Sequence, residues 1–392
     1  MLQLTIANFR KGSYVLVEGR AESNRFFIIQ SGQVMCFKEN DPTNRTILGP
    51  GDFVGVIACM SGHIEYENAV ATTDVVAIAV RKEQYPELIE KNTPVAMKII
   101  RTFATRMREV NDSLTRLTLK SATVQSPEQL FTNAKYYESN AKINLALYAY
   151  YQYLKVVPTG ENAEYAKKRI AVFSKKGMPP YLETSTETVR MYSKDNMIFS
   201  ECQNGNDMFI IQGGQIKITK VVEGNEVTLA ILKKGDFFGE MALLENKPRS
   251  ANAICFEDCT LMVVNRQNFN QMVTTQPQMI ARLTHTLAER LWSMSRQLEN
   301  AKIQEPEHKM IDMLSLQLEK QHFACVRGSN FKFDFNQYEL LNMCGIPQEM
   351  QAIAINQFLK DPLVRIQENK IFAPDCEELS KQAAFYRKSR PR

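Results

Sequence analysis

The chain contains two copies of one sequence pattern, and this repeat limits the possible folds more than any other feature. Residues 26–34 read FFIIQSGQV, and residues 208–216 read MFIIQGGQI, 182 positions later. GDFVG at 51–55 is matched by GDFFG at 235–239, 184 positions later. The extra two residues are a loop-length difference of the kind that folds tolerate easily. A chain with this pattern is expected to form two similar units.

Each copy consists of short, alternating apolar runs bounded by glycines. Alternation with a period of two is typical of half-buried strands, and several such strands in succession indicate a small roll or barrel. Each copy is followed by a helical pattern. We therefore predict an α+β chain with two β-rolls of the jelly-roll type, each ending in a helix.

The helix after each copy carries a coiled-coil seam. The first seam has four-three spacing, and the second is less strict. Three arrangements fit. Each helix packs on its own roll, or two chains pair through helices 96–117 and 280–298 as a homodimer, or the two units of one chain pair as a pseudo-dimer. The seam residues are Ala96, Ile100, Phe103, Met107, Val110, Leu114 and Leu117, then Ile280, Leu283, Leu287, Leu291, Met294 and Leu298.

The second copy places an acid and a base nine residues apart around small residues, in the segments 238–244 and 248–251. Arg249 can offer paired donors to a phosphate, and Glu240 can accept a hydrogen bond from a ribose hydroxyl. Backbone N–H groups at such a turn form an anion-binding nest. One phosphate charge and one ribose hydroxyl are what a cyclic nucleotide presents, so the pattern predicts a site for one.

This stretch resembles the phosphate-binding cassette of the cyclic-nucleotide-binding domain family. The resemblance implies that Glu240 binds the ribose, that Arg249 binds the cyclic phosphate, and that the base meets the long helix near Ser295. Serine rather than threonine after the arginine is similar to bacterial cyclic-AMP sensors and favours cyclic AMP over cyclic GMP. The expected ligand-binding residues are Gly239, Glu240, Met241, Ala242, Arg249, Ser250, Ala251 and Ser295.

The first copy has lost these groups. Val56 stands at the position of Glu240, Glu65 at that of Arg249, and Tyr66 at that of Ser250. A glutamate there repels a phosphate. We expect the first roll to be a scaffold and dimerisation module, or to bind a different ligand.

Residues 126–176 between the copies read as two or three helices with interleaved tyrosines and alanines. They resemble one tetratricopeptide (TPR) repeat, which cannot bury its own face and has to pack on a neighbour. An interdomain spacer and a partner-docking module both fit. Residues 175–180 read as a hinge.

Residues 305–392 show the order helix, strand, two helices and hairpin, which resembles the winged helix of the catabolite-activator (Crp/Fnr) regulators. Gly345 occupies the turn between the two helices. Recognition helices usually offer Arg, Lys, Asn or Gln to bases. The second helix begins QEMQAIAI, so its glutamines can still read adenine, but it has no basic residue before Lys360. Sequence-specific DNA binding, protein contact and weak nonspecific DNA binding remain open, and we expect any useful positive charge in a flexible basic tail, 387–392.

Bulk properties narrow the class of protein. No apolar run reaches 18 residues, no signal peptide is evident, and none of the eight cysteines forms a CxxC pair. The four histidines, at 63, 285, 308 and 322, have no metal-ligand spacing. We predict a cytoplasmic, non-enzymatic sensor without cofactor, metal or membrane, acting as a transcription regulator or as a signalling adaptor. The expected domains are 1–120, 121–178, 179–304 and 305–392.

Overall fold

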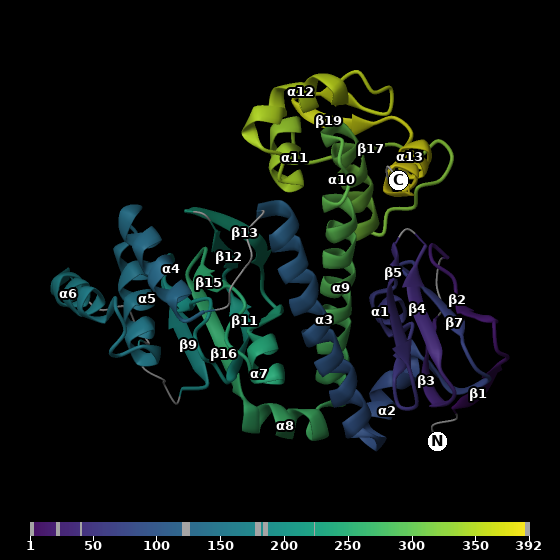
Figure 1. Cartoon of the computed structure of the whole chain (residues 1–392), viewed down its shortest axis with the longest axis horizontal. Helices are drawn as coiled ribbons and strands as arrows, with labels where there is room; N and C mark the ends of the chain where they lie inside the picture. Colours follow the sequence, from purple (N-terminus) through teal and green to yellow (C-terminus); the bar gives the residue numbers. More distant parts are fainter. Residues whose placement is uncertain are drawn as a thin grey trace. The chain divides into compact units, whose positions relative to one another are not determined.

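The computed structural model describes residues 4–20, 24–39, 41–119, 126–176, 182, 187–222 and 224–388 (Figure 1). The chain divides into two compact units. One comprises Met1–Tyr85, Val110–Thr118 and Ala288–Arg392, and the other comprises Pro86–Glu109 and Leu119–Leu287. No helix in the described ranges combines the length and the apolar character that crossing a lipid bilayer requires.

The first roll consists of two antiparallel four-stranded sheets with the strand orders β1-β8-β3-β6 and β2-β7-β4-β5. A short helix, α1 (Val56–Ser61), follows β6, and α2 (Tyr85–Lys91) and α3 (Thr93–Leu119) follow the last strand. The strands are β1 (Thr5–Phe9), β2 (Tyr14–Leu16), β3 (Arg25–Ser31), β4 (Val34–Lys38), β5 (Asp41–Leu48), β6 (Phe53–Val54), β7 (Asn68–Ala71) and β8 (Val75–Arg81).

The second roll repeats this topology strand for strand, with the orders β9-β16-β11-β14 and β10-β15-β12-β13. Helix α7 (Glu240–Glu245) stands where α1 stands, and α8 (Arg266–Thr275) and α9 (Pro277–Ala301) follow. The predicted pair of β-rolls is confirmed. The strands are β9 (Val189–Tyr192), β10 (Met197–Phe199), β11 (Asp207–Gly213), β12 (Ile216–Val222), β13 (Asn225–Leu232), β14 (Phe237–Phe238), β15 (Asn252–Cys255) and β16 (Cys259–Asn265).

The repeated glycines have a steric cause. Gly32 and Gly214 occupy the same hairpin position in the two rolls, with φ of 87° and 79°. A Cβ added at either would lie 2.2 Å from a backbone carbonyl oxygen, that of Asp74 or of Asp258. Only glycine fits such a turn, which is why both copies keep it.

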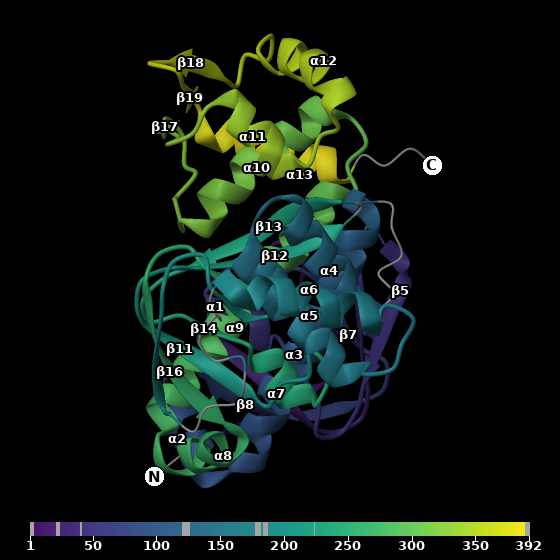
Figure 2. The same ribbon diagram turned by 90° about the vertical axis from the view of Figure 1, so that its left-hand side faces the viewer.

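The insert forms three helices, α4 (Glu128–Ser139), α5 (Ile143–Val156) and α6 (Ala163–Phe173), followed by a 3₁₀ turn, Ser174–Lys176. Helices α4 and α5 lie beside the strands of the second roll, and α6 packs on the far side of α5 (Figures 1 and 2). Asn133 is fully buried and donates to Ser200 Oγ and Asn252 Oδ1, both at 3.2 Å. The apolar face of the insert is therefore covered by the second roll. The predicted hinge at 175–180 lies mostly outside the described residues.

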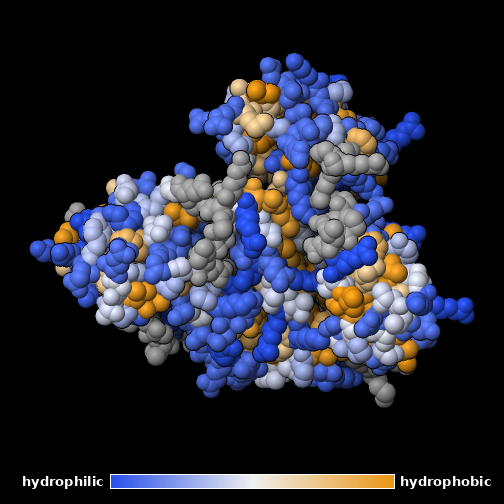
Figure 3. Space-filling view, in the orientation of Figure 1, coloured by the Kyte–Doolittle hydropathy of each residue, from blue (hydrophilic) through white to orange (hydrophobic). Residues whose placement is uncertain are grey.

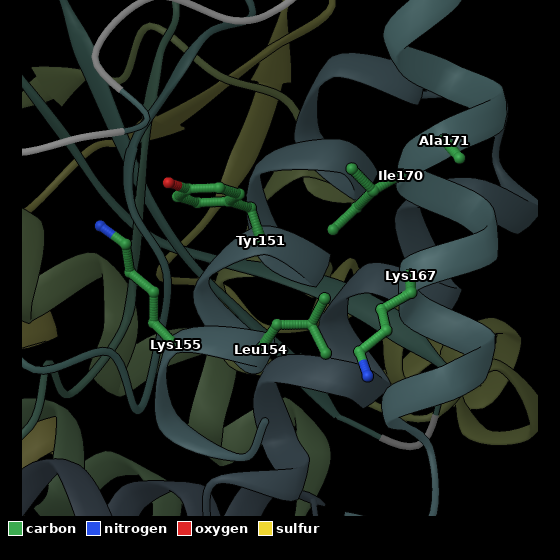
Figure 4. A pocket seen from close by; sticks show the side chains of 6 residues that line it. All are labelled: Tyr151, Leu154, Lys155, Lys167, Ile170 and Ala171. Carbon is green, nitrogen blue, oxygen red and sulfur yellow. The ribbon is translucent and has the colours of Figure 1, made fainter. Parts of the chain in front are cut away.

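A groove of about 390 Å³ lies between α5 and α6. Apolar patches (orange) interrupt the hydrophilic surface of the insert in the space-filling view (Figure 3), and Val172 of α6 is 49% exposed. This leaves partner docking open as a role for the insert. The groove is lined by Tyr151, Leu154, Lys155, Lys167, Ile170 and Ala171 (Figure 4).

The first halves of both helical seams are buried within one chain, so they need no second copy to cover them. Leu117, at the end of the first seam, is 48% exposed, and on α9 the polar Ser295 and Asn300 are buried. The buried seam residues are Ala96, Ile100, Phe103, Met107, Ile280, Leu283, Leu287 and Leu291.

The C-terminal segment follows the predicted order: α10 (Pro306–Lys320), β17 (Phe331–Lys332), α11 (Gln337–Cys344), α12 (Gln348–Phe358), β18 (Arg365–Gln367) and β19 (Lys370–Ala373). Gly345 ends α11 with φ of 62°. The start of the predicted flexible tail belongs instead to a helix, α13 (Cys376–Lys388). Its Arg387 forms an ion pair with the fully buried Asp312, so this arginine is not available as a mobile charge.

Candidate functional site

The segment from Gly239 to Ala251, called the cassette below, bends sharply because of its first residue. Gly239 has φ of 77° and caps α7, so that Glu240 begins the helix and is buried. A Cβ on Gly239 would lie 2.7 Å from Nη1 of Arg249. The glycine thus lets the arginine approach the backbone, and the turn brings the predicted acid and base into one short segment.

Arg249 is almost completely enclosed, with 5% of its surface exposed. Its Nη1 donates to the carbonyl oxygen of Gly239 at 2.7 Å. The guanidinium carbon lies 4.3 Å from the ring centroid of Phe199 and 5.8 Å from that of Phe209, which are cation–π contacts. The fork of the arginine therefore points into the roll.

The charge of Arg249 is incompletely compensated. Burial lowers the pKa of its guanidinium to about 10, because Asp207, Tyr148 and Glu240 offset only part of the lost hydration. Its Nε has no hydrogen-bond partner among the residues that the structure describes. A buried cation with an unsatisfied donor is a favourable site for an incoming anion.

The loop that contains Cys202 and Gln203 forms hydrogen bonds with both the backbone N–H and the carbonyl oxygen of Arg249. Cys202 N donates to Arg249 O, and Arg249 N donates to Gln203 O, each at 2.9 Å. Tyr148 of the insert donates to Gln203 Oε1 at 3.2 Å. A Cβ on Gly205 would lie 2.4 Å from Nε of Arg249, so this glycine leaves room for the guanidinium. Sequence reasoning missed all of these supports.

Arg108 of α3 holds the C-terminal end of the cassette helix and the loop that follows it. Its Nε donates to Glu245 at 2.6 Å, and both Nη atoms reach the carbonyl oxygen of Pro248 at 3.2 Å. The side chains of Arg108 and Glu245 are 6% and 4% exposed. A helix that follows the first roll in sequence thus supports the cassette of the second roll in the same chain.

The other predicted residues divide into two groups. Ala242 and Ala251 are buried in the cassette, and Ser250 Oγ lies 3.7 Å from Met241 Sδ. Ser295 is buried on α9, in the part that belongs to the unit containing the first roll. The structure therefore brings seven of the eight predicted residues together in the cassette, and the role of Ser295 stays a prediction.

The first roll has the same cassette backbone with opposite chemistry. Gly19 N donates to Glu65 O, and Glu65 N donates to Arg20 O, which reproduces the pair around Arg249. A Cβ on Gly55 would meet Leu16 and Glu65, whereas one on Gly239 would meet Phe199 and Arg249. The buried Glu65 thus stands where Arg249 stands, and the first cassette is anionic at the phosphate position.

Comparison with known proteins agrees with this repeat. Residues 6–92 and 189–276, which coincide with the two rolls, match the family described as "Cyclic nucleotide-binding domain". The chain is 26% identical over 178 residues to "Cyclic AMP receptor protein" of Thermus thermophilus, which is 45% of this chain and 79% of that protein. It is 40% identical over 90 residues to "cGMP-dependent protein kinase 2" of Homo sapiens, or 22% of this chain and 12% of the kinase. A solved structure, "Crystal Structure of Thermus thermophilus Catabolite Activator Protein", is 23% identical and covers 50% of this chain and 90% of that one, with a TM-score of 0.29.

Proposed function

The chain carries two cyclic nucleotide-binding domains and is related to Crp-like regulators, and we propose that its second domain, residues 189–276, senses a cyclic nucleotide, with cyclic AMP as the preferred ligand. Arg249 binds the cyclic phosphate, Glu240 accepts from the ribose 2′-hydroxyl, and the N–H groups of Ala242 and Ala251 complete the anion nest. The protein works by binding and carries out no reaction of its own.

One observation supports this proposal above the others: the buried guanidinium of Arg249, with its unsatisfied Nε. A surface ion pair between Glu240 and Arg249 would leave both side chains hydrated. Here both side chains are buried, and Gly239 and Gly205 leave room for the guanidinium of Arg249. Burying a charge is costly, and a phosphate held in two charge-assisted hydrogen bonds offsets that cost.

The proposal is tested by titrating cyclic AMP, cyclic GMP and cyclic dinucleotides into the full chain by calorimetry. We expect cyclic AMP to bind most tightly, with one equivalent per chain, because only the second roll has the required residues. Arg249→Gln should weaken binding by about 100-fold or more, because it removes the charge partner of the phosphate. Arg282→Gln, an exposed arginine of α9, is the matched control. Unchanged affinity in Arg249→Gln would refute the assignment.

We propose that the C-terminal segment transmits the signal of ligand binding and that the protein acts as a transcription regulator. Ligand binding shifts the packing of roll and helix only to the extent that the ligand prefers one state. Homodimerisation would use the later halves of the seams, within 96–117 and 280–298, since the earlier halves are already covered. Sedimentation of the chain with and without cyclic AMP tests this part.

A signalling adaptor that works by protein contact is the second candidate, and a specific observation favours it. Helix α12, in the position of a recognition helix, contains no basic residue and exposes Met350 (42%) and Ile353 (59%). Tyr338 and Met343 of α11 are exposed as well. Binding to a mixed-sequence DNA duplex across a salt series separates the candidates: tight, steeply salt-dependent binding supports the regulator, and no binding at low salt supports the adaptor.

A further inference from the structure

Two histidines and a glutamate from three distant segments of one unit meet at one point. His63 follows α1 of the first roll, Glu289 lies on α9, and His322 follows α10. Nε2 of His63 is 2.9 Å from one carboxylate oxygen of Glu289, and Nε2 of His322 is 3.6 Å from the other. All three ligand atoms lie within 4.8 Å of one another.

His63 is held in place by a stack of rings. The centroid of its ring is 3.6 Å from that of Trp292 and 4.3 Å from that of His322, and both pairs of rings have an interplanar angle of 10°. The side chain of His63 is 4% exposed, whereas that of His322 is 51% exposed. The cluster thus has one fixed imidazole and one imidazole that can turn.

We propose that His63, Glu289 and His322 form a binding site for a divalent transition-metal ion, with zinc as the best chemical match. Imidazole nitrogen and carboxylate oxygen are preferred zinc ligands, and two histidines with one carboxylate leave a fourth position for water. The partly exposed side chains of Glu289 and His322 give the ion access from solvent.

Binding requires a small, local rearrangement. Zinc lies about 2.0–2.2 Å from its nitrogen and oxygen ligands, close to the plane of each imidazole. Because the two rings are parallel, one ion cannot lie in both planes. His322 turns its half-exposed ring toward the ion, while Trp292 keeps His63 in position.

The site gives the first domain a ligand of a different kind. Its cassette helix α1 ends at Ser61, two residues before His63, and the cassette itself carries Glu65 in place of the phosphate-binding arginine. A bound ion would connect this roll to α9 and to the C-terminal segment within one unit. Since only the folded chain brings the ligands together, ion binding would also stabilise that unit.

The test is a titration of zinc chloride into the untagged, chelator-treated full chain without nucleotide. Trp292 is the only tryptophan of the sequence, so its fluorescence reports directly on the ring stack. We expect a fluorescence change that saturates at one zinc per chain, and at least tenfold weaker binding in His322→Gln.

His308→Gln is the matched control, because His308 also lies near one glutamate, 3.7 Å from Glu305, and also stacks on an aromatic ring, that of Tyr386. It should bind zinc as the unchanged chain does. No fluorescence change, or equal affinity in His322→Gln and His308→Gln, would overturn the proposal. His322→Gln is preferred to a change at His63 because its exposed side chain can be replaced without opening a cavity.

Discussion

Replacing Arg108 by methionine should loosen the cassette without touching any proposed ligand contact. Arg108 and Glu245 are a buried ion pair, 2.6 Å apart. Removing one partner of such a pair costs about 3–5 kcal/mol, because the other charge stays buried. Lys247, 3.2 Å from the other oxygen of Glu245, is half exposed and compensates in part, so we expect about 3 kcal/mol.

Hydrogen exchange, measured by mass spectrometry on peptides that cover 240–250, reports the local stability of the cassette. At about 1.4 kcal/mol per factor of ten, a loss of 3 kcal/mol corresponds to roughly 100-fold faster exchange. Affinity for cyclic AMP should fall with it, since an open cassette binds poorly. Arg101→Met, an exposed arginine of the same helix, should change neither quantity.

The double variant Arg108→Met with Glu245→Met isolates the cause. Replacing both members of a buried pair by apolar residues is often nearly neutral. We therefore expect the double variant to recover most of the protection that Arg108→Met loses. If Arg108→Met exchanges like the unchanged chain, the ion pair does not hold the cassette and the reasoning fails.

Two further outcomes concern the packing of each unit. Asn133→Ala should lower the free energy of unfolding by about 1–3 kcal/mol, because it removes the amide donor to the buried Ser200 Oγ and one of the three donors to Asn252 Oδ1. Urea unfolding measures this, with the exposed Thr132→Ala as control. Burial opposes ionisation of Glu299, but Lys38 and Lys302 outweigh it and lower its pKa from 4.5 to about 2. A depressed carboxyl pKa stabilises the fold above pH 4.5 and loses this effect as pH falls toward 2, so Glu299→Gln should flatten the pH dependence of melting in that window, and an unchanged slope would contradict the assignment.

The rolls could be predicted because their signals are local. Glycines at fixed points and period-two alternation determine each hairpin, and the repeat supplies the evidence twice. The cassette could be predicted for the same reason, since its acid and base are nine residues apart. Arg108 and Glu245 are 137 residues apart, and no local pattern connects them. No local pattern connects Tyr148 with Gln203 either, or the three residues of the His63–Glu289–His322 cluster with one another.

Helix α13 is a different kind of miss. The prediction emphasised the basic end of the chain and treated it as a tail. Yet Cys376, Leu379 and Ala383 follow helical spacing, and all three are fully buried. The apolar period was present in the sequence and outweighed the terminal charge. The buried partner of Arg387, Asp312, is 75 residues away and could not be seen.

The two cassettes of one chain show what the cassette backbone needs and what it does not. Both have a glycine with φ near 78° before a six-residue helix, and both hold the position of Arg249 or Glu65 between two backbone hydrogen bonds. The charge at that position is opposite, and the packing residue beneath it differs, Leu16 or Phe199. The backbone is therefore set by glycine and by strand ends, not by the ligand-binding side chain. Loss of nucleotide binding in Arg249→Gln can accordingly be attributed to the missing charge rather than to a collapsed cassette.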